Sequence, residues 1–551
     1  MATTDFSAPG LGSWSLDKVH TPDPVTPIMA ATFGPNLTYG FAKTFAAYGL
    51  PVVTIHFADV NWYSYGSRQS LGDPNPDGTM PAFDLGEEFA KRAETAERAF
   101  AERIWRDELA TWDNEVKPAA IAAHAALTRV DLPALSDCAL SVHIDACVGH
   151  HEAMIRQHHT FNMAAILPVG DFMARARTWT GLATVELISL FEGYSPTSGV
   201  WSDEIADAAS ALGRSEMAQS IITSDDDAVK RLFAIRELVP EVGAWLDRVS
   251  FRLSDGFDVL NPTIGELPAL ALGKLRAATD LGGPPNLDHV AARTEAVRAK
   301  VPKDAQDEFD EALGEARLTY RLRDERGVYS DMSSAGLLRL ALRELGRRLV
   351  DVGSIRLADH ALFLTREEAV ALAIGAARPT ADELHKRVAA HEHAKTLDPP
   401  ATLGPEPAPA ADPSTLPPGM ARGITAMGAL LGPPPDAKPA GDPADNELRG
   451  IAAHPGVVEG RARLIRSTAD LLEMEPGDII VAVTTSEAFN SAIHLAGAIV
   501  TDQGGIASHP AIVAREVGIP AVVDTQVATT RIVDGATIRV DGARGLVTII
   551  E

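Results

Sequence analysis

Residues 500–523 read Val-Thr-Asp-Gln-Gly-Gly-Ile-Ala-Ser-His-Pro-Ala-Ile-Val-Ala-Arg-Glu-Val-Gly-Ile-Pro-Ala-Val-Val. A short run of apolar and β-branched residues at 498–501 leads into this stretch and predicts a buried strand. A similar run at 521–523 closes it and predicts a second strand. The segment between them therefore has to connect two strands, which indicates an α/β unit.

The connecting segment carries clear helix signals. Pro510 is favoured in the first turn of a helix, where its missing N–H costs nothing. Gly518 suits the left-handed position that ends a helix, and Pro520 prevents its continuation. We therefore predict a helix over 510–517 with His509 as its N-cap.

The residues before this helix suit an anion. Gly504 and Gly505 adopt backbone angles closed to other residues and let the chain approach a ligand closely. A phosphoryl group on the imidazole of His509 would face free amides and the positive end of the helix dipole, with the Ser508 hydroxyl beside it. Neutral imidazole is a nucleophile near pH 7. The pattern predicts a phosphohistidine at His509; the alternative is an ordinary turn with a structural histidine.

This stretch resembles the phosphohistidine, or swivelling, domain of the phosphoenolpyruvate-utilising enzymes, whose motif runs T-x-x-G-G-x-x-[ST]-H-x-A-[IV]-[IV]-A-R-E-x-G-I-P-A-V-V. The matching positions are Thr501, Gly504, Gly505, Ser508, His509, Ala511, Ala514, Arg515, Glu516, Gly518, Ile519 and Pro520. Pro510 departs from the small residue more usual there. The segments 454–460, 476–481 and 534–542 resemble the opening turn, the next strand and the closing hairpin of the same domain. The resemblance implies that His509 is the phosphorylated intermediate and that Thr501, Gly504, Gly505, Ser508 and Arg515 complete its catalytic site.

The composition limits the class of protein. A chain of 551 residues predicts two to four domains. A net charge of −26 argues against nucleic acid and anionic membranes as partners, and no apolar run approaches the ~18 residues of a membrane span. Cys138 and Cys147 are the only cysteines and the start lacks a signal peptide, so we expect a cytoplasmic protein without disulfides.

We predict a multidomain chain with three parts. Residues 1–396 form a mostly α-helical acceptor-binding domain, residues 397–446 a linker rich in proline and alanine, and residues 447–551 an α/β swivelling domain. As a flexible coil, a linker of roughly 50 residues spans about 35–40 Å. It would let the last domain travel, although a passive spacer fits the same composition. Within these parts we expect helices over 87–128, 140–163, 206–212, 337–350 and 420–431, and a strand over 51–57.

The N-terminal part also resembles the acceptor-binding region of phenylphosphate synthase and rifampin phosphotransferase type dikinases. The similar segments, in the order of the family, are 14–20, 24–27, 321–326, 346–350 and 357–365. The 551 residues show no ATP-grasp domain and no Gly-x-x-x-x-Gly-Lys-[Ser/Thr] loop. The resemblance therefore implies that ATP and Mg are bound by a separate ATP-grasp subunit. The β-phosphoryl group of ATP would pass through His509 to the hydroxyl of a small, phenol-like or benzylic acceptor, giving a phosphate ester, AMP and phosphate.

An acceptor hydroxyl needs a base, and three patches are candidates for the acceptor site. The first is a histidine-rich helical segment. His143 and His150 are seven residues apart, as are His151 and His158, so each pair lies on one face of the helix. The second is unusually aromatic and could contact a flat ring. The third is a row of arginines at 321–326 that could bind a phosphoryl group. The acceptor-site residues that we predict are His56, Trp62, Tyr63, Tyr65, His143, His150, His151 and Arg323, while His158, His159, Asn61, Arg321 and Arg326 lie in the same patches.

Each patch also has a structural interpretation: a packed helix, an aromatic core corner and a solvated helix face. We predict no metal site, although the histidine-rich helix offers ligands, because their spacing matches no closed motif. Two other functions compete with the dikinase subunit. One is a phosphocarrier that passes phosphate to another protein, and the other is an antibiotic-inactivating phosphotransferase subunit.

Overall fold

The computed structural model describes residues 6–18, 20–224, 226–254, 256–407, 412–432, 446–466, 470–485, 489 and 492–550. Contacts divide the chain into two compact units. The first unit comprises 1–164, 251–263 and 326–423, and the second comprises 165–250, 264–325 and 424–551. These units do not follow the boundaries 396 and 446, because helices from the middle of the chain group with the C-terminal residues. The functional division into acceptor domain, linker and swivelling domain stays a prediction.

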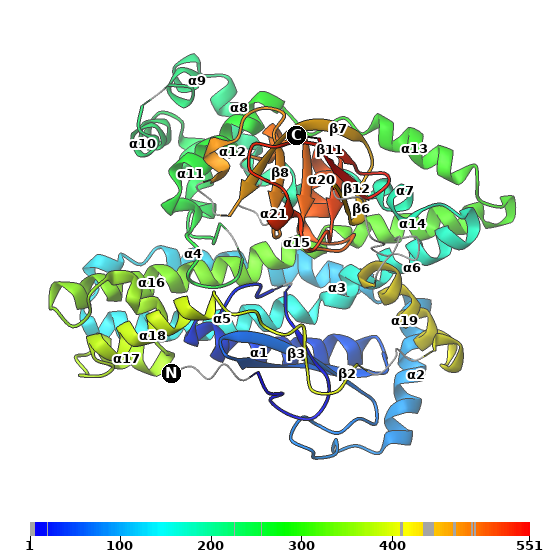
Figure 1. Cartoon of the computed structure of the whole chain (residues 1–551), viewed down its shortest axis with the longest axis horizontal. Coiled ribbons are helices and arrows are strands. Elements are labelled where there is room, and N and C mark those ends of the chain that lie inside the picture. The colour runs from blue at the N-terminus through cyan, green and yellow to red at the C-terminus, as the bar shows by residue number, and fades with distance from the viewer. Residues whose placement is uncertain are drawn as a thin grey trace. The chain divides into compact units, whose positions relative to one another are not determined.

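The first unit combines helices with a small antiparallel sheet of strand order β2-β3-β1-β4. The sheet consists of β1 (Trp14–Leu16), β2 (Val52–Val60), β3 (Tyr63–Ser70) and β4 (Thr402–Leu403). The helices are α1 (Pro27–Ala47), α2 (Leu85–Glu102), α3 (Trp105–Thr111), α4 (Lys117–Thr128), α5 (Asp137–Thr160), α16 (Ser333–Asp351), α17 (Arg366–Ala373) and α18 (Ala381–Ala394). A large apolar cluster joins α5, α16 and α17, with Ile144, Leu342 and Leu372 among its buried members. In Figure 1 this unit carries the blue to cyan and the yellow-green colours.

The second unit has a helical part and a sheet part. Its helices before the sheet are α6 (Asn162–Thr180), α7 (Thr184–Ile188), α8 (Asp203–Gly213), α9 (Glu216–Ile222), α10 (Ala228–Leu238), α11 (Pro240–Val249), α12 (Pro268–Leu281), α13 (Asp288–Arg298), α14 (Gln306–Tyr320) and α15 (Leu322–Gly327). A separate apolar cluster holds α8, α10, α11 and α12 together around Leu212, Ile235 and Trp245. α6, α15 and α19 (Pro418–Leu431) each contribute residues to both units.

The C-terminal residues form an eight-stranded mixed sheet with the order β5-β12-β11-β7-β8-β9-β10-β6. Its strands are β5 (Glu447–Arg449), β6 (Ile451–His454), β7 (Val457–Ile465), β8 (Ile479–Ala482), β9 (Ala498–Thr501), β10 (Ala521–Val523), β11 (Thr537–Asp541) and β12 (Leu546–Ile549). The strands β7, β8, β9 and β10 run parallel. The short helices α20 (His509–Val517) and α21 (Ala528–Arg531) complete the domain, drawn in orange and red in Figure 1. Because parallel strands end at the same edge, the residues after β8 and β9 are brought together there.

Most elements expected from the sequence are present. The strands predicted at 498–501 and 521–523 are β9 and β10, and the predicted helix is α20, one residue longer at its start. The long helix expected over 87–128 is broken, because Arg103 takes a left-handed conformation after α2. The segment expected over 140–163 is α5, which ends at Thr160. The mostly helical N-terminal region and the α/β C-terminal region are therefore confirmed, and the N-terminal region also contains a four-stranded sheet.

The segment predicted as a linker is partly structured. Its described residues include α19, the helix expected over 420–431, in which Met420, Ala426 and Leu430 are buried. Residues 408–411 and 433–445 lie outside the described residues, so the flexibility predicted for them is not tested. Cys138 and Cys147 are both free thiols. No helix in the described ranges is long and apolar enough to cross a membrane.

Candidate functional site

His509 is the first residue of α20, directly after the glycine loop that follows β9. Ser508 is the N-cap with an extended backbone, so the predicted N-cap position is shifted by one residue. The first helical hydrogen bond runs from the amide of Ile512 to the carbonyl of Ser508. The amides of His509 and Ala511 therefore lie at the open, positive end of the helix. Gly518 ends the helix with φ of 74°, as expected.

One ring nitrogen of His509 is fixed and the other is unused. Its Nδ1 lies 2.9 Å from the hydroxyl oxygen of Thr485, a residue that the sequence analysis did not select. Its Nε2 is buried and makes no hydrogen bond to the described residues. The pKa of His509 is lowered to about 3, mainly by burial and also by the charge of Lys274, while a hydrogen bond to the Thr485 backbone acts in the opposite sense. The imidazole is therefore neutral at pH 7, and its Nε2 carries no hydrogen bond to a described residue.

The two glycines of the loop have different roles. Gly504 has φ of 131°, and a Cβ placed there would lie 2.6 Å from the hydroxyl oxygen of Ser508. At Gly505, a Cβ would meet no atom within 4 Å. The Ser508 hydroxyl donates to the carbonyl of Gly505 at 2.7 Å, and that of Thr501 donates to the carbonyl of Gln503 at 2.8 Å. In this conformation Thr501 and Ser508 shape the loop.

Arg515 donates a hydrogen bond to the glycine loop that precedes His509. It is fully buried, and its guanidinium donates to the carbonyl of Ile506 at 2.7 Å and to that of Ala453 at 3.2 Å. It also donates to the hydroxyl of Tyr320 in α14 at 2.9 Å. With its donors directed to these groups, Arg515 connects the glycine loop to the sheet and to a helix, which makes it a positioning residue in this structure.

Two further cations belong to the surroundings of His509. The Nε of Arg323, in α15, donates to the carbonyl of Ala507, two residues before His509. Lys274, in α12, lies close enough to His509 to lower its pKa electrostatically. Both would stabilise a phosphoryl group on the histidine. Arg323 was predicted as an acceptor-site residue, and the structure places it at the His509 loop instead.

Buried carboxyl groups lie next to these cations. Asp324 accepts hydrogen bonds from the hydroxyls of Ser195 and Ser198. Glu516 accepts from the amide of Ser195 at 3.1 Å. Burial raises the pKa of Glu516 to about 8, with the negative charge of Asp324 adding to the shift. Glu516 thus connects α20, and Asp324 connects α15, to the segment 195–198.

The aromatic patch predicted to bind an acceptor makes contacts within the protein, and most of its residues lie in the small sheet. The Tyr63 hydroxyl donates to the carbonyl of Ala394 at 2.9 Å, and the Tyr65 hydroxyl donates to that of Pro400 at 3.0 Å. Further predicted members also contact protein groups: His56 bonds to Gln69 at 2.8 Å, and Trp62 packs edge-on against His391. These contacts favour the structural interpretation of the patch.

The predicted histidines of α5 are dispersed. His143 lies 3.5 Å from the sulfur of Cys147, His150 packs against His124, and the Nδ1 of His151 bonds to Ser334 at 2.8 Å. Burial lowers the pKa of all three, so they are neutral. The structure does not bring these three together into one site.

A different pair from the same helix does form a cluster. His158 and His159 lie with Asp331 so that one ligand atom from each falls within 4.8 Å of the others, and all three residues are buried. The Nδ1 of His158 is 2.7 Å from Asp331 Oδ2. His20 packs against His159, with ring centroids 5.7 Å apart. The histidine pattern predicted a site on this helix, but no local signal pointed to Asp331, which lies 173 residues after His158.

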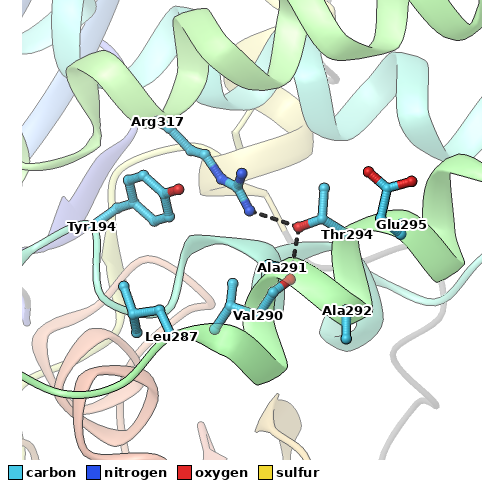
Figure 2. A pocket seen from close by; sticks show the side chains of 8 residues that line it. All are labelled: Tyr194, Leu287, Val290, Ala291, Ala292, Thr294, Glu295 and Arg317. Atoms are coloured by element: carbon cyan, nitrogen blue, oxygen red, sulfur yellow. Dashed lines mark hydrogen bonds between the residues drawn. The ribbon is translucent and has the colours of Figure 1, made fainter.

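A hollow of about 480 Å³ lies in the second unit (Figure 2). Its lining residues are Tyr194, Leu287, Val290, Ala291, Ala292, Thr294, Glu295 and Arg317. Arg317 donates to Thr294 at 2.8 Å and stacks on Tyr194, and the Thr294 hydroxyl donates to the carbonyl of Val290. Because these polar groups already bond to one another, we assign no function to this hollow.

The strand, glycine loop and helix-starting histidine form an α/β unit in which the imidazole of His509 lies at the open end of a helix. Comparison with known families agrees: residues 474–545 match the family described as PEP-utilising enzyme, mobile domain. The C-terminal part of the chain therefore carries a mobile domain of the type found in phosphoenolpyruvate-utilising enzymes.

Relatives share parts of the chain. An uncharacterized phosphotransferase of Bacillus subtilis is 44% identical over 107 residues, 19% of this chain and 13% of that protein. A probable phosphoenolpyruvate synthase of Archaeoglobus fulgidus is 45% identical over 100 residues, 18% of this chain and 13% of that protein. Chondramide synthase of Chondromyces crocatus is 34% identical over 269 residues, 47% of this chain and 7% of that protein. The match to chondramide synthase covers 269 residues and is therefore too long to lie within 447–551 alone. This chain spans only a small fraction of the length of each of these relatives.

Proposed function

We propose that this chain is the phosphoryl-carrying and acceptor-binding subunit of a dikinase-type phosphotransferase. The Nε2 atom of His509 would receive the β-phosphoryl group of ATP from a separate ATP-grasp subunit, which binds the ATP and Mg. It would then pass the group to the hydroxyl of a small, phenol-like or benzylic acceptor. The observation that carries the proposal is the state of His509: neutral, fixed at Nδ1 by Thr485 and without a hydrogen bond at Nε2 among the described residues.

The second transfer needs little from the protein beyond position and charge. The acceptor oxygen attacks phosphorus, the P–N bond breaks, and its electron pair returns to Nε2. The hydroxyl proton passes to a base at the acceptor site. Lys274, Arg323 and the open amides of α20 offset the charge on the phosphoryl group while it is carried. Because Nε2 is covered in this conformation, both transfers require the histidine to become exposed.

Phosphorylation of His509 can be tested with the full chain, ATP labelled at the β-phosphate, and an extract of the native cells. We expect acid-labile, base-stable label on the wild type and none on His509→Ala. His393→Ala, which removes an exposed histidine of α18, is the matched control and should be labelled like the wild type. Equal label on wild type and His509→Ala would refute the relay.

The nature of the acceptor requires a second step. Labelled protein is separated from the extract and incubated with phenol or benzyl alcohol, and the label is followed by chromatography. Transfer to a phosphate ester supports the proposed reaction. Release only as inorganic phosphate would contradict these acceptors. Transfer to a protein of the extract would favour a phosphocarrier instead, the function that the carrier domain alone could perform.

A further inference from the structure

His158, His159 and Asp331 form a buried cluster of potential metal ligands that has no role in the proposed phosphoryl relay. Its three potential ligands are two imidazoles from the end of α5 and one carboxylate from the π-helical turn Val328–Met332. π-helical turns occur frequently at functional sites, because they require an extra residue in the helix. Two imidazoles and a carboxylate are a donor set typical of divalent first-row transition metals.

Unused polar atoms point to a missing partner. His159 is 1% exposed, yet neither its Nδ1 nor its Nε2 makes a hydrogen bond to the described residues. Asp331 is 0% exposed and its Oδ1 is likewise without a hydrogen-bond partner among them. A buried polar atom left in this state costs about 1–3 kcal/mol. Three such atoms in one cluster are difficult to explain by packing alone.

We propose that His158, His159 and Asp331 bind one divalent transition-metal ion. Ligand atoms about 2.1 Å from a metal lie roughly 3–3.4 Å from one another. The present atoms lie within 4.8 Å, so binding requires small side-chain rotations. The imidazole of His159 can turn toward the ion without breaking a hydrogen bond to a described residue, whereas the Asp331 carboxylate would exchange its contact with His158 for one with the metal.

Neighbouring groups bear on the charge of the site. Arg326 donates to the carbonyl of His158 at 2.9 Å and is a nearby cation that opposes an ion. The carboxylate of Asp17, bonded to His20 at 3.0 Å, adds a second negative charge beside the cluster. Burial raises the pKa of Asp331 well above its ordinary value, so a divalent ion would displace a proton from Asp331 and would then face two carboxylates and one guanidinium. The stacked rings of Phe33 and Phe257 lie next to His20.

Metal binding by the full chain tests the proposal. The protein is stripped with a chelator and titrated with Co²⁺ or Zn²⁺, and bound metal is measured by mass spectrometry and by the visible spectrum of Co²⁺. We expect one equivalent bound by wild type and by His393→Ala, which removes an exposed histidine elsewhere. His159→Phe and Asp331→Asn should each lower affinity more than the 10–100-fold typical for loss of an outer-shell partner. Absence of binding to wild type, or wild-type affinity in both variants, overturns the proposal.

Thermal unfolding provides a second readout. Without metal, His159→Phe should unfold at or above the wild-type temperature, because it replaces unsatisfied polar atoms with an apolar ring. Added metal should raise the unfolding temperature of wild type but not of His159→Phe. X-ray absorption of the wild-type complex should show two imidazole ligands, and a shell of oxygen atoms only would refute the assignment even if both variants failed to fold. His509→Ala should bind metal like wild type, so this test stands apart from the phosphoryl relay.

Discussion

The His509 loop and the His158 cluster place histidines in buried surroundings by opposite means. Around His509, the glycine loop, the N-cap and the helix come from one continuous stretch, 500–523, and side chains of other segments, among them Thr485 and Arg323, contact it. The cluster is assembled from α5 and from a helical turn 173 residues away. The first arrangement is encoded locally, whereas the second exists only when the first unit has folded.

This difference explains how the two sites are supported. Local sequence sets the backbone at Gly504 and the start of α20, and the buried Arg515 attaches the loop to Ala453 in β6 and to Tyr320 in α14. The cluster depends on the packing of α5 against α16 and the adjoining π-helical turn. We therefore expect substitutions near His509 to act mainly through the residues that attach the loop to its neighbours.

The largest loss of stability is expected on substitution of Arg515, which attaches the glycine loop to other segments. Arg515→Met leaves the carbonyls of Ala453 and Ile506 and the hydroxyl of Tyr320 without their buried donor. The loss should lower the free energy of unfolding by about 3–5 kcal/mol. Urea unfolding followed by circular dichroism measures it, with the exposed Arg466→Met as control. A change as small as that of the control would mean that the loop does not need its attachment to α14.

Alanine substitutions at Gly504 and Gly505 test how much of the loop conformation depends on backbone angles that favour glycine. Gly504→Ala meets both a positive φ and the Ser508 hydroxyl, so it should destabilise the protein by about 1–3 kcal/mol. Gly505→Ala has open space and should change stability by less than about 0.5 kcal/mol. Both variants are compared by urea unfolding. Equal costs at the two positions would contradict the assignment of the strained conformation to Gly504.

The predictability of the two sites follows the same division. Strands β9 and β10, helix α20 and the left-handed Gly518 were all predicted, because each depends on residues within a few positions of one another. Thr485 was missed although a signal exists. It follows β8, which pairs in parallel with β9, so the ends of the two strands had to meet beside His509.

Contacts between distant segments could not be derived from spacing. The histidine pattern of α5 selected the helix, but only the position of Asp331 distinguishes His158 and His159 from His143, His150 and His151. Arg323 was predicted near a phosphoryl group for its charge, and its contact with the carbonyl of Ala507 depends on the docking of α15. The aromatic residues Tyr63 and Tyr65 satisfy carbonyls more than 300 positions away.

Thr485 tests whether the contact from the neighbouring strand matters for chemistry. Thr485→Val removes the hydroxyl that fixes His509 and should cost about 1–1.5 kcal/mol of transition-state stabilisation, or about tenfold in rate. The measurement is the initial rate of labelling from ATP carrying a labelled β-phosphate, and Thr484→Val is the neighbouring control. If both variants are labelled at the wild-type rate, the position of His509 is set by its own segment alone.

A pH dependence is expected at the attachment of α20. The pKa of Glu516 is raised by burial to about 8, above its ordinary value of 4.5, so between these values the folded state holds a proton that the unfolded state has lost. The corresponding stabilisation is complete below pH 4.5 and declines as pH rises toward 8. Glu516→Gln keeps a neutral side chain of similar shape, while the neighbouring Asp324 and Arg515 are unchanged. The unfolding temperature of wild type should therefore fall more steeply between pH 5 and 8 than that of the variant. Parallel curves would show that Glu516 is ionised in the folded protein, and α20 would then be held by its charge beside Arg515.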